Sequence, residues 1–179
     1  MRVLIATNDQ TFTPSLVAAY GARGWEVATG ADNLFYRAAA YDLIHLHWPE
    51  ELAGWKIPDQ RAEERVTSVL EWWSSRAKLV ATVHNLMPHG RISSEPDRKL
   101  YRAVYNASHV ISHFSQYSLE QVSRLFPEVA RNKHITHKPF LFDDLKVYCR
   151  GREDARHHLG IRGGEFAVLA FGAFRNGEE

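Results

Sequence analysis

The chain has 179 residues, 45% of them hydrophobic and 24% charged, and its formal net charge is +1 at pH 7. This composition predicts one globular core and gives no support to a nucleic-acid partner. No run approaches the roughly 18 apolar residues of a membrane span, and the first apolar run is too short for a signal peptide. Cys149 is the only cysteine, so no intrachain disulfide can form. We therefore expect a soluble cytoplasmic protein, with peripheral membrane contact left open.

The N-terminal part of the chain follows the order strand, helix, strand. Residues 2–7 form a compact apolar run rich in β-branched side chains, which predicts a strand. Pro14 suits a first helical turn, and residues 15–22 carry apolar side chains at helical spacing. Residues 25–29 form the second predicted strand. This order requires a right-handed crossover and therefore a parallel sheet.

The middle of the chain contains the clearest helix. Residues 33–40 predict a short helix or turn, and residues 43–48 predict a third strand that Pro49 ends, since proline cannot donate to a ladder. Residues 59–78 carry one apolar stripe opposite a charged face, which is typical of a surface helix. Residues 79–84 are the fourth predicted strand.

Two more helices and two more strands are predicted before the chain loses its periodicity. A helix over residues 94–107 has Ser94 or the next residue as its cap. Residues 109–114 predict a strand, a capping-box pattern starts a helix over 118–126, and residues 134–137 predict a short strand.

The predicted fold class is α/β, a Rossmann-like parallel sheet of about six strands with helices on both faces. We assign residues 1–150 to this domain. Residues 138–152 look like a connector, and a short helix follows over residues 153–159. The apolar run 166–171 is expected to be the first strand of a second domain, so residues 151–179 are assigned as linker and first strand.

Three histidines end apolar strands. His45 and His47 are two residues apart, so their side chains share one face, and His84 ends the next strand. Such histidines could hold a metal, which keeps a metal-dependent hydrolase using all three open. In the alternative reading, one histidine of the pair packs in the core and the other lies at the strand tip. His84 is either a hydrogen-bond donor to a sugar hydroxyl or phosphate oxygen, or a strand-end histidine satisfied by backbone groups.

Several common motifs are missing. Thr-Asn-Asp-Gln-Thr follows the first strand in place of a glycine-rich fingerprint, which argues against a dinucleotide oxidoreductase. The sequence has no Walker motif and no Gly-x-Ser-x-Gly elbow. A non-catalytic α/β binding module stays open as a further alternative.

Four stretches together resemble the N-terminal half of a GT-B glycosyltransferase of the large retaining class called family 4. Residues 42–48, Asp-Leu-Ile-His-Leu-His-Trp, are similar to that family's strand ending in His-x-His. Residues 81–85 are similar to its Thr-x-His-Asn strand end, and residues 110–118 to its hydrophobic strand leading through serine into a helix. Residues 155–175 are similar to the piece that opens its second Rossmann-like domain. The likeness covers nearly the whole chain in the family's order.

The resemblance implies the acceptor-side domain of an enzyme that moves a sugar from a nucleotide-diphospho-sugar to a polysaccharide or glycolipid acceptor. It implies no metal and no cofactor besides the sugar nucleotide as co-substrate. It places His84 at the donor sugar as the catalytic residue and Arg175 near the diphosphate. The other expected substrate contacts are Asn8, Phe12, His47, Trp48 and Asn85.

One stretch departs from the family's pattern. Asn-Gly-Glu-Glu follows Arg175 where the family has lysine-glycine, and the family's donor-binding glutamates would lie beyond it. We therefore expect the chain to be inactive alone. The partners expected from the resemblance are a sugar nucleotide and a glycan or lipid-linked acceptor. We also expect the run 166–171 to be weakly anchored, or exchanged with a neighbour in a swapped oligomer.

Overall fold

The computed structural model describes residues 1–89, 92–137 and 150–168. The chain divides into two compact units, Met1–Pro139 and Phe140–Glu179. Most of the predicted connector 138–152 lies outside the described residues.

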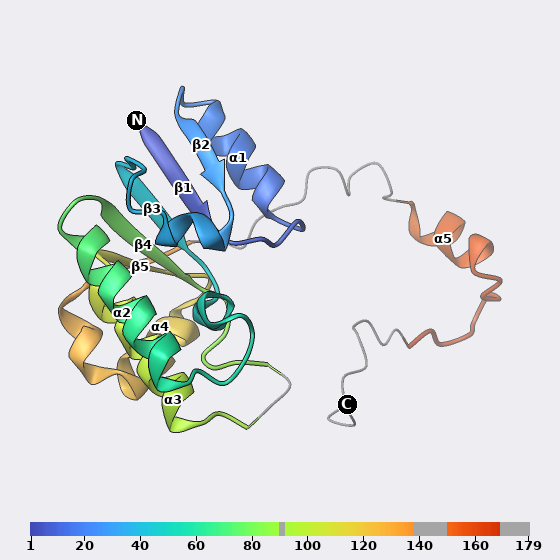
Figure 1. Cartoon of the computed structure of the whole chain (residues 1–179). Helices are drawn as coiled ribbons and strands as arrows, with labels where there is room; N and C mark the ends of the chain where they lie inside the picture. The colour runs from blue at the N-terminus through green and yellow to red at the C-terminus, as the bar shows by residue number, and fades with distance from the viewer. Residues whose placement is uncertain (90–91, 138–149, 169–179) are drawn as a thin grey trace. The chain divides into compact units, whose positions relative to one another are not determined.

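The first unit is built on a parallel sheet (Figure 1). Its strands are β1 (Arg2–Ala6), β2 (Glu26–Thr29), β3 (Leu43–Leu46), β4 (Lys78–Val83), β5 (Val110–His113) and β6 (Lys133–Thr136). They lie in the order β2-β1-β3-β4-β5-β6, and every neighbouring pair is parallel. The predicted α/β, Rossmann-like fold is confirmed.

The helices alternate with these strands. They are α1 (Thr13–Gly21), α2 (Gln60–Ser74), α3 (Glu95–Ala107) and α4 (Gln116–Leu125), with short 3₁₀ helices η1 (Ala31–Phe35), η2 (Pro49–Ala53) and η3 (Pro127–Arg131). The second unit contains α5 (Arg152–His158).

The strand order reverses direction beside β1. The chain steps outward from β1 to β2, then returns to β3 on the other side of β1 and continues to β6. Ligands of open parallel sheets bind outside the carboxyl ends of the strands at such a switch point. The loops after β1 and β3 flank this position.

Helices cover both faces of the sheet. The main core joins Ile44 and Ala81 of the sheet to Leu70 of α2, Val104 of α3 and Val122 of α4. Figure 1 shows α2, α3 and α4 together, while α1 lies apart from them beside β2. On the α1 side, the buried side chains include Ile5, Leu16 and His45. The predicted arrangement of helices on both faces is confirmed.

Some predicted boundaries are wrong by a few residues. The helix predicted to reach residue 78 ends at Ser74, because Lys78 donates its backbone N–H to Asp42 and begins β4. The helix predicted to start at Ser118 begins at Gln116, because the Ser115 hydroxyl accepts a hydrogen bond from the Ser118 N–H at 3.1 Å. The 3₁₀ helix η2 follows β3 where no element was predicted.

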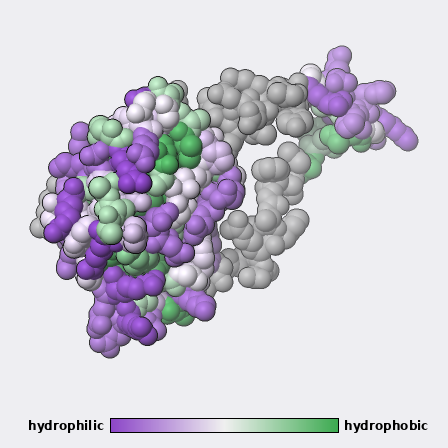
Figure 2. All heavy atoms as spheres, turned by 45° about the horizontal axis from the view of Figure 1, so that its top comes forward, coloured by the Kyte–Doolittle hydropathy of each residue, from purple (hydrophilic) through white to green (hydrophobic). Residues whose placement is uncertain are grey.

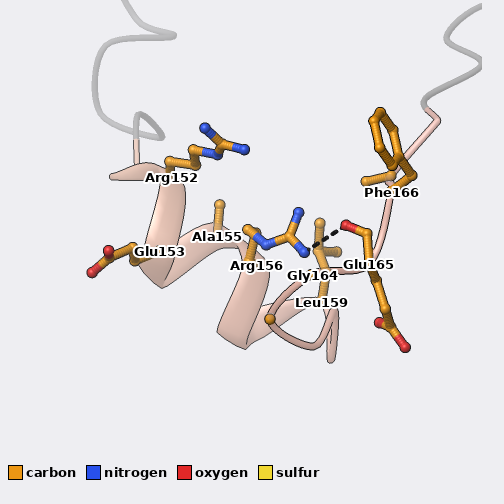
Figure 3. Close-up of a pocket in the computed structure, with 10 residues that line it drawn as sticks. Arg152, Glu153, Ala155, Arg156, Leu159, Gly164, Glu165 and Phe166 are labelled. Carbon is orange, nitrogen blue, oxygen red and sulfur yellow. Dashed lines mark hydrogen bonds between the residues drawn. The ribbon is translucent and has the colours of Figure 1, made fainter.

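The described part of the second unit, residues 150–168, is largely exposed. No residue of α5 is buried. A concavity of about 840 Å³ lies between α5 and residues 163–167. Figure 3 shows Arg156 reaching across it to the Glu165 carbonyl, 2.9 Å away, while Glu153 points away.

The apolar run predicted as a strand over 166–171 is only partly described. Residues 166–168 form no strand, and Phe166 and Val168 are almost fully exposed. Residues 169–171 and Arg175 lie outside the described part of the chain.

On the face in Figure 2, hydrophilic side chains predominate on the first unit and smaller hydrophobic areas lie between them. A search of the described residues finds no helix that is both long and apolar enough to cross a membrane.

The cap of α3 gives a test of the fold. The Ser94 hydroxyl accepts from the Asp97 N–H, and the Asp97 carboxylate accepts from the Ser94 N–H, which makes a reciprocal capping box. We predict that Ser94→Ala lowers the free energy of unfolding by about 1 kcal/mol in urea titrations. Asn106→Ala, at an exposed position on the same helix, should not destabilise the protein. Equal stability of Ser94→Ala and wild type would contradict the role of this cap.

Candidate functional site

The candidate site lies at the carboxyl edge of the sheet. Asn8 follows β1, His47 and Trp48 follow β3, and His84 follows β4. Because the strands are parallel, all three loops start from the same edge. They lie beside the switch point between β1 and β3.

The pairing of β3 with β4 brings the histidines together. Leu46 lies opposite Ala81, so His47 and Thr82 follow at the next pair of positions. His45 Nε2 lies 2.8 Å from the Thr82 hydroxyl, and His47 Nδ1 lies 2.9 Å from His84 Nε2. The rings of His45 and His47 are 4.3 Å apart, which confirms that the pair shares one face.

Aromatic rings pack around the His47–His84 pair. The Trp48 indole stacks on His84 with centroids 4.3 Å apart. Phe12 lies 4.7 Å from His47 and 5.2 Å from His84, and Phe114 meets His84 edge-on at 5.3 Å. His84 is therefore held on several sides in one orientation.

Two buried carboxylates fasten the loop that carries Trp48. Glu51 accepts hydrogen bonds from the Thr7 hydroxyl at 2.6 Å and from the Asn8 N–H at 2.7 Å. Glu50 accepts from the Tyr101 hydroxyl at 2.6 Å. Charge-assisted hydrogen bonds are among the strongest available to side chains. They tie η2 both to the loop after β1 and to α3.

The hydrogen-bond pattern assigns the tautomers of His47 and His84. His47 Nε2 is buried and has no hydrogen-bond partner among the described residues. A buried N–H without a partner is rarer than a buried lone pair without one. We therefore assign the proton of His47 to Nδ1, from which it donates to His84 Nε2. His84 then carries its own proton on Nδ1 and offers an N–H donor.

Burial keeps these histidines neutral. Desolvation lowers the pKa of His45 to about 3 and that of His84 to about 4, while Asp9 partly opposes the shift of His84. Burial, with His45 and His84 close by, also lowers the pKa of His47 well below its ordinary value. At neutral pH the site therefore presents neutral imidazoles, which donate and accept hydrogen bonds but carry no charge.

His45 lies on the inner side of this cluster. Its Nδ1 lies 3.2 Å from the Tyr20 hydroxyl of α1, and its Nε2 is engaged by Thr82. Both ring nitrogens therefore have protein partners. His45 links α1 to β4 and supports His47 from beneath.

A second chain of histidines joins β5, β6 and α4. The carbonyl of Val129 can only accept, so His134 Nε2 donates to it at 3.0 Å. His134 Nδ1 must then accept from His113 Nε2–H, also at 3.0 Å. His113 Nδ1 in turn accepts from the Ser118 hydroxyl. Burial lowers the pKa of His113 to about 4, with His134 and His137 adding to the shift.

A hollow of about 230 Å³ opens next to His84. Its lining includes Asn85, Phe114, Ser115, Tyr117 and Ser118. These residues come from the loop after β4, the end of β5 and the first turn of α4. His84 thus borders a space large enough for several polar ligand atoms.

The structure brings together most, but not all, of the predicted site residues. Phe12, His47, Trp48 and His84 form one cluster, and Asn85 donates weakly to Glu50 at 3.5 Å. Asn8 is exposed at the same edge, and Arg175 lies outside the described residues.

Sequence reasoning missed the residues that hold the cluster in place. They are Thr7, Tyr20, Glu50, Glu51, Thr82 and Tyr101, to none of which the sequence assigned a supporting role. Two consecutive glutamates directly after a strand-ending proline were a usable signal. The hydrogen-bond partners of those glutamates could not be found from the sequence, because they lie 35 or more residues away.

The donor atoms do not form a metal centre in the described parts of the chain. No group of three or more His, Cys, Asp or Glu side chains there is placed to hold one ion. His47 Nδ1 and His84 Nε2 face each other, and both nitrogens of His45 have protein partners.

No family model matches this chain, and a search of curated proteins gives no significant match.

The neutral histidines predict acid sensitivity. Folding lowers their pKa below the value of about 6.5 in the unfolded chain, so the unfolded state binds more protons below about pH 6.5. We predict full stability above that pH and a loss, between about pH 6.5 and 4, approaching about 1.4 kcal/mol per pH unit for each of His45 and His113. Urea titrations across this range measure the slope.

His45→Gln removes one of these titrating groups and should flatten the slope. His157→Gln, on the exposed surface of α5, should leave it unchanged. A slope unaffected by His45→Gln would contradict a buried neutral His45.

The hydrogen bond from the Tyr101 hydroxyl to Glu50 gives a further test. Tyr101→Phe removes a donor from a buried carboxylate, so we predict a loss of about 1.5–3 kcal/mol in the free energy of unfolding. Tyr105→Phe is the matched control, because the Tyr105 hydroxyl makes no hydrogen bond to a described residue, and it should have the smaller effect. Equal effects of the two changes would show that Glu50 does not depend on Tyr101.

Proposed function

We propose that this chain supplies the acceptor-side domain of a GT-B glycosyltransferase, which moves a sugar from a nucleotide-diphospho-sugar to a glycan or lipid-linked acceptor. The observation that carries the proposal is His84. It is a neutral histidine held by His47 and Trp48 at the carboxyl end of β4, bordering a hollow at the ligand-binding edge of the sheet.

The chemistry of His84 suits sugar recognition. Its Nδ1–H, assigned from the hydrogen-bond pattern, is a neutral donor fixed by the bond to His47. A fixed neutral donor can bind a sugar hydroxyl without the desolvation of a full charge. The proposed role of His84 is therefore to position a hydroxyl of the donor sugar near the reacting centre.

The second observation that supports the proposal is an aromatic surface beside a polar donor. The Trp48 ring is partly exposed and stacks on His84. A pyranose ring has apolar C–H faces and a polar rim, so it can pack against the indole while its hydroxyls bond to His84 or Asn85. Phe12 is buried against His47, so we place it in the wall of the site.

The charge that develops on a departing diphosphate needs cations or fixed N–H donors. The described edge offers neutral histidines, and no glycine-rich loop follows β1. In this proposal the diphosphate is bound by a second, donor-binding domain, to which residues 151–179 and Arg175 belong. The chain alone is then inactive.

The two alternative functions, a metal-dependent hydrolase and a non-catalytic binding module, require different structures. A hydrolase would need His45, His47 and His84 to turn toward one ion, which breaks the hydrogen bonds to Tyr20, Thr82 and between His47 and His84. Stoichiometric zinc in the purified protein would favour it. A non-catalytic binding module would place residues 166–171 within a single closed domain.

Two binding measurements test the proposal. We predict that isothermal titration of the chain with UDP-glucose or GDP-mannose gives no Kd tighter than about 1 mM, since the diphosphate ligands are assigned elsewhere. On a glycan array the chain should bind an acceptor-type glycan, and Trp48→Ala should weaken that binding by about tenfold or more. His84→Ala should weaken it less, because His84 is assigned to the donor sugar.

Ser68→Ala, on the exposed face of α2, is the control and should bind like wild type. A Kd near 1 µM for a sugar nucleotide would contradict the acceptor-side assignment. Glycan binding that Trp48→Ala leaves unchanged would contradict the site.

A further inference from the structure

An exposed apolar loop follows η2 at the edge that carries the candidate site. It comprises Gly54, Trp55, Lys56 and Ile57, which are exposed, and Pro58, which is buried. Trp55 is 54% exposed and Ile57 is 55% exposed, so more than half of each side chain faces solvent. Lys56 stands between them.

The backbone holds Trp55 outward in an unfavourable conformation. Its φ is +62°, in the left-handed region, and it is the single non-glycine residue with positive φ among those described. Bulky residues rarely adopt this conformation. Backbone hydrogen bonds from Trp55 N–H to the Glu50 carbonyl and from Gly54 N–H to the Glu51 carbonyl fix it. The indole is only partly buried, and backbone outliers of this kind often lie at functional sites.

The loop lies close to the candidate site. The Trp55 ring is 6.1 Å from Trp48, which stacks on His84. The loop after the neighbouring strand β4 carries Ile92, which is 95% exposed. These two loops lead into α2 and α3, which pack against each other. Exposed apolar side chains therefore stand on adjacent loops at one edge.

We propose that the loop Gly54–Pro58 docks the protein on a lipid bilayer. Tryptophan favours the boundary between headgroups and acyl chains, because its ring is apolar and its indole N–H is polar. Ile57 adds apolar area, and the long side chain of Lys56 can reach an anionic phosphate while its stem stays in apolar surroundings. A bilayer needs no matching concave shape, so a short loop tip is a sufficient contact.

The inference extends the proposed function. A lipid-linked acceptor carries its sugar at the bilayer surface, and docking through Trp55 would bring that surface beside Trp48 and His84. Vesicle binding needs no sugar, so it can fail while glycan binding persists, and the reverse also holds. The two proposals are therefore tested separately.

The test is sedimentation of the whole chain with vesicles of phosphatidylcholine and phosphatidylglycerol in a 3:1 ratio. We expect wild type to bind and its tryptophan fluorescence to be quenched by brominated acyl chains. Trp55→Ala and Ile57→Ser should each lower the partition coefficient by about tenfold, the effect of losing one inserted apolar side chain. Lys56→Gln should lower it by a few-fold on these vesicles and not on pure phosphatidylcholine.

Tyr36→Ala is the matched control, because Tyr36 is an exposed aromatic residue on a different segment, and it should bind like wild type. Trp55→Gly is a control for misfolding, because glycine readily adopts the positive φ of this position. It should lose vesicle binding as Trp55→Ala does. Failure of wild type to bind vesicles would overturn the inference. Equal vesicle binding by wild type and by the Trp55 and Ile57 variants would also overturn it. A third contradicting result would be that Trp55→Ala loses glycan binding although the protein does not bind vesicles.

Discussion

The parallel pairing of β3 with β4 is the constraint on which the site depends. It sets His47 beside Thr82 and leaves His84 one step beyond the strand end, within 2.9 Å of His47. A shift of one residue in this register would turn the histidines to the opposite face, among the helices of the main core. The same pairing buries Ile44 and Ala81 against those helices, so packing of the core and placement of the histidines enforce each other. This coupling explains how short, four- to six-residue strands can hold a polar cluster at their ends.

Burial then decides the chemistry of the cluster. A histidine in water is poised to titrate near neutral pH, whereas His45, His47 and His84 are shifted to lower pKa by desolvation. As a result, the histidines at this edge of the sheet act as fixed neutral hydrogen-bond donors and acceptors and do not become charged near neutral pH. Such an edge discriminates between ligands by the geometry of their hydroxyl groups, and it offers little to a phosphate. For this reason the proposed function places the diphosphate of a sugar nucleotide in another domain.

The sequence predicted the fold well because its signals were local. Each strand of the first unit was placed within two residues, since apolar runs bounded by loop residues mark buried parallel strands, and the alternation rule correctly put His45 and His47 on one face. The strand predicted over 166–171 is not formed by residues 166–168. The site was predicted only in part. Its supports come from pairs far apart in sequence, such as Glu50 with Tyr101 and His45 with Tyr20. No periodicity encodes such pairs. The start of α4 was misplaced for another reason, because two serines, Ser115 and Ser118, both suit a helix cap.

The packing of Phe12 restricts how a substrate can reach the histidines. Phe12, in the loop after β1, was expected to contact the substrate, but its ring is 6% exposed and covers His47 and His84 from the side of α1. Asp9 holds that loop by accepting from the N–H groups of Thr11 and Phe12. The opposite side of His84 borders the hollow shared with Asn85, Phe114 and Ser118. A ligand that leaves Phe12 in place must therefore approach His84 from the β5 side. The residues that choose among ligands are then Trp48 and those of the β4 and β5 loops and the first turn of α4, rather than those that follow β1.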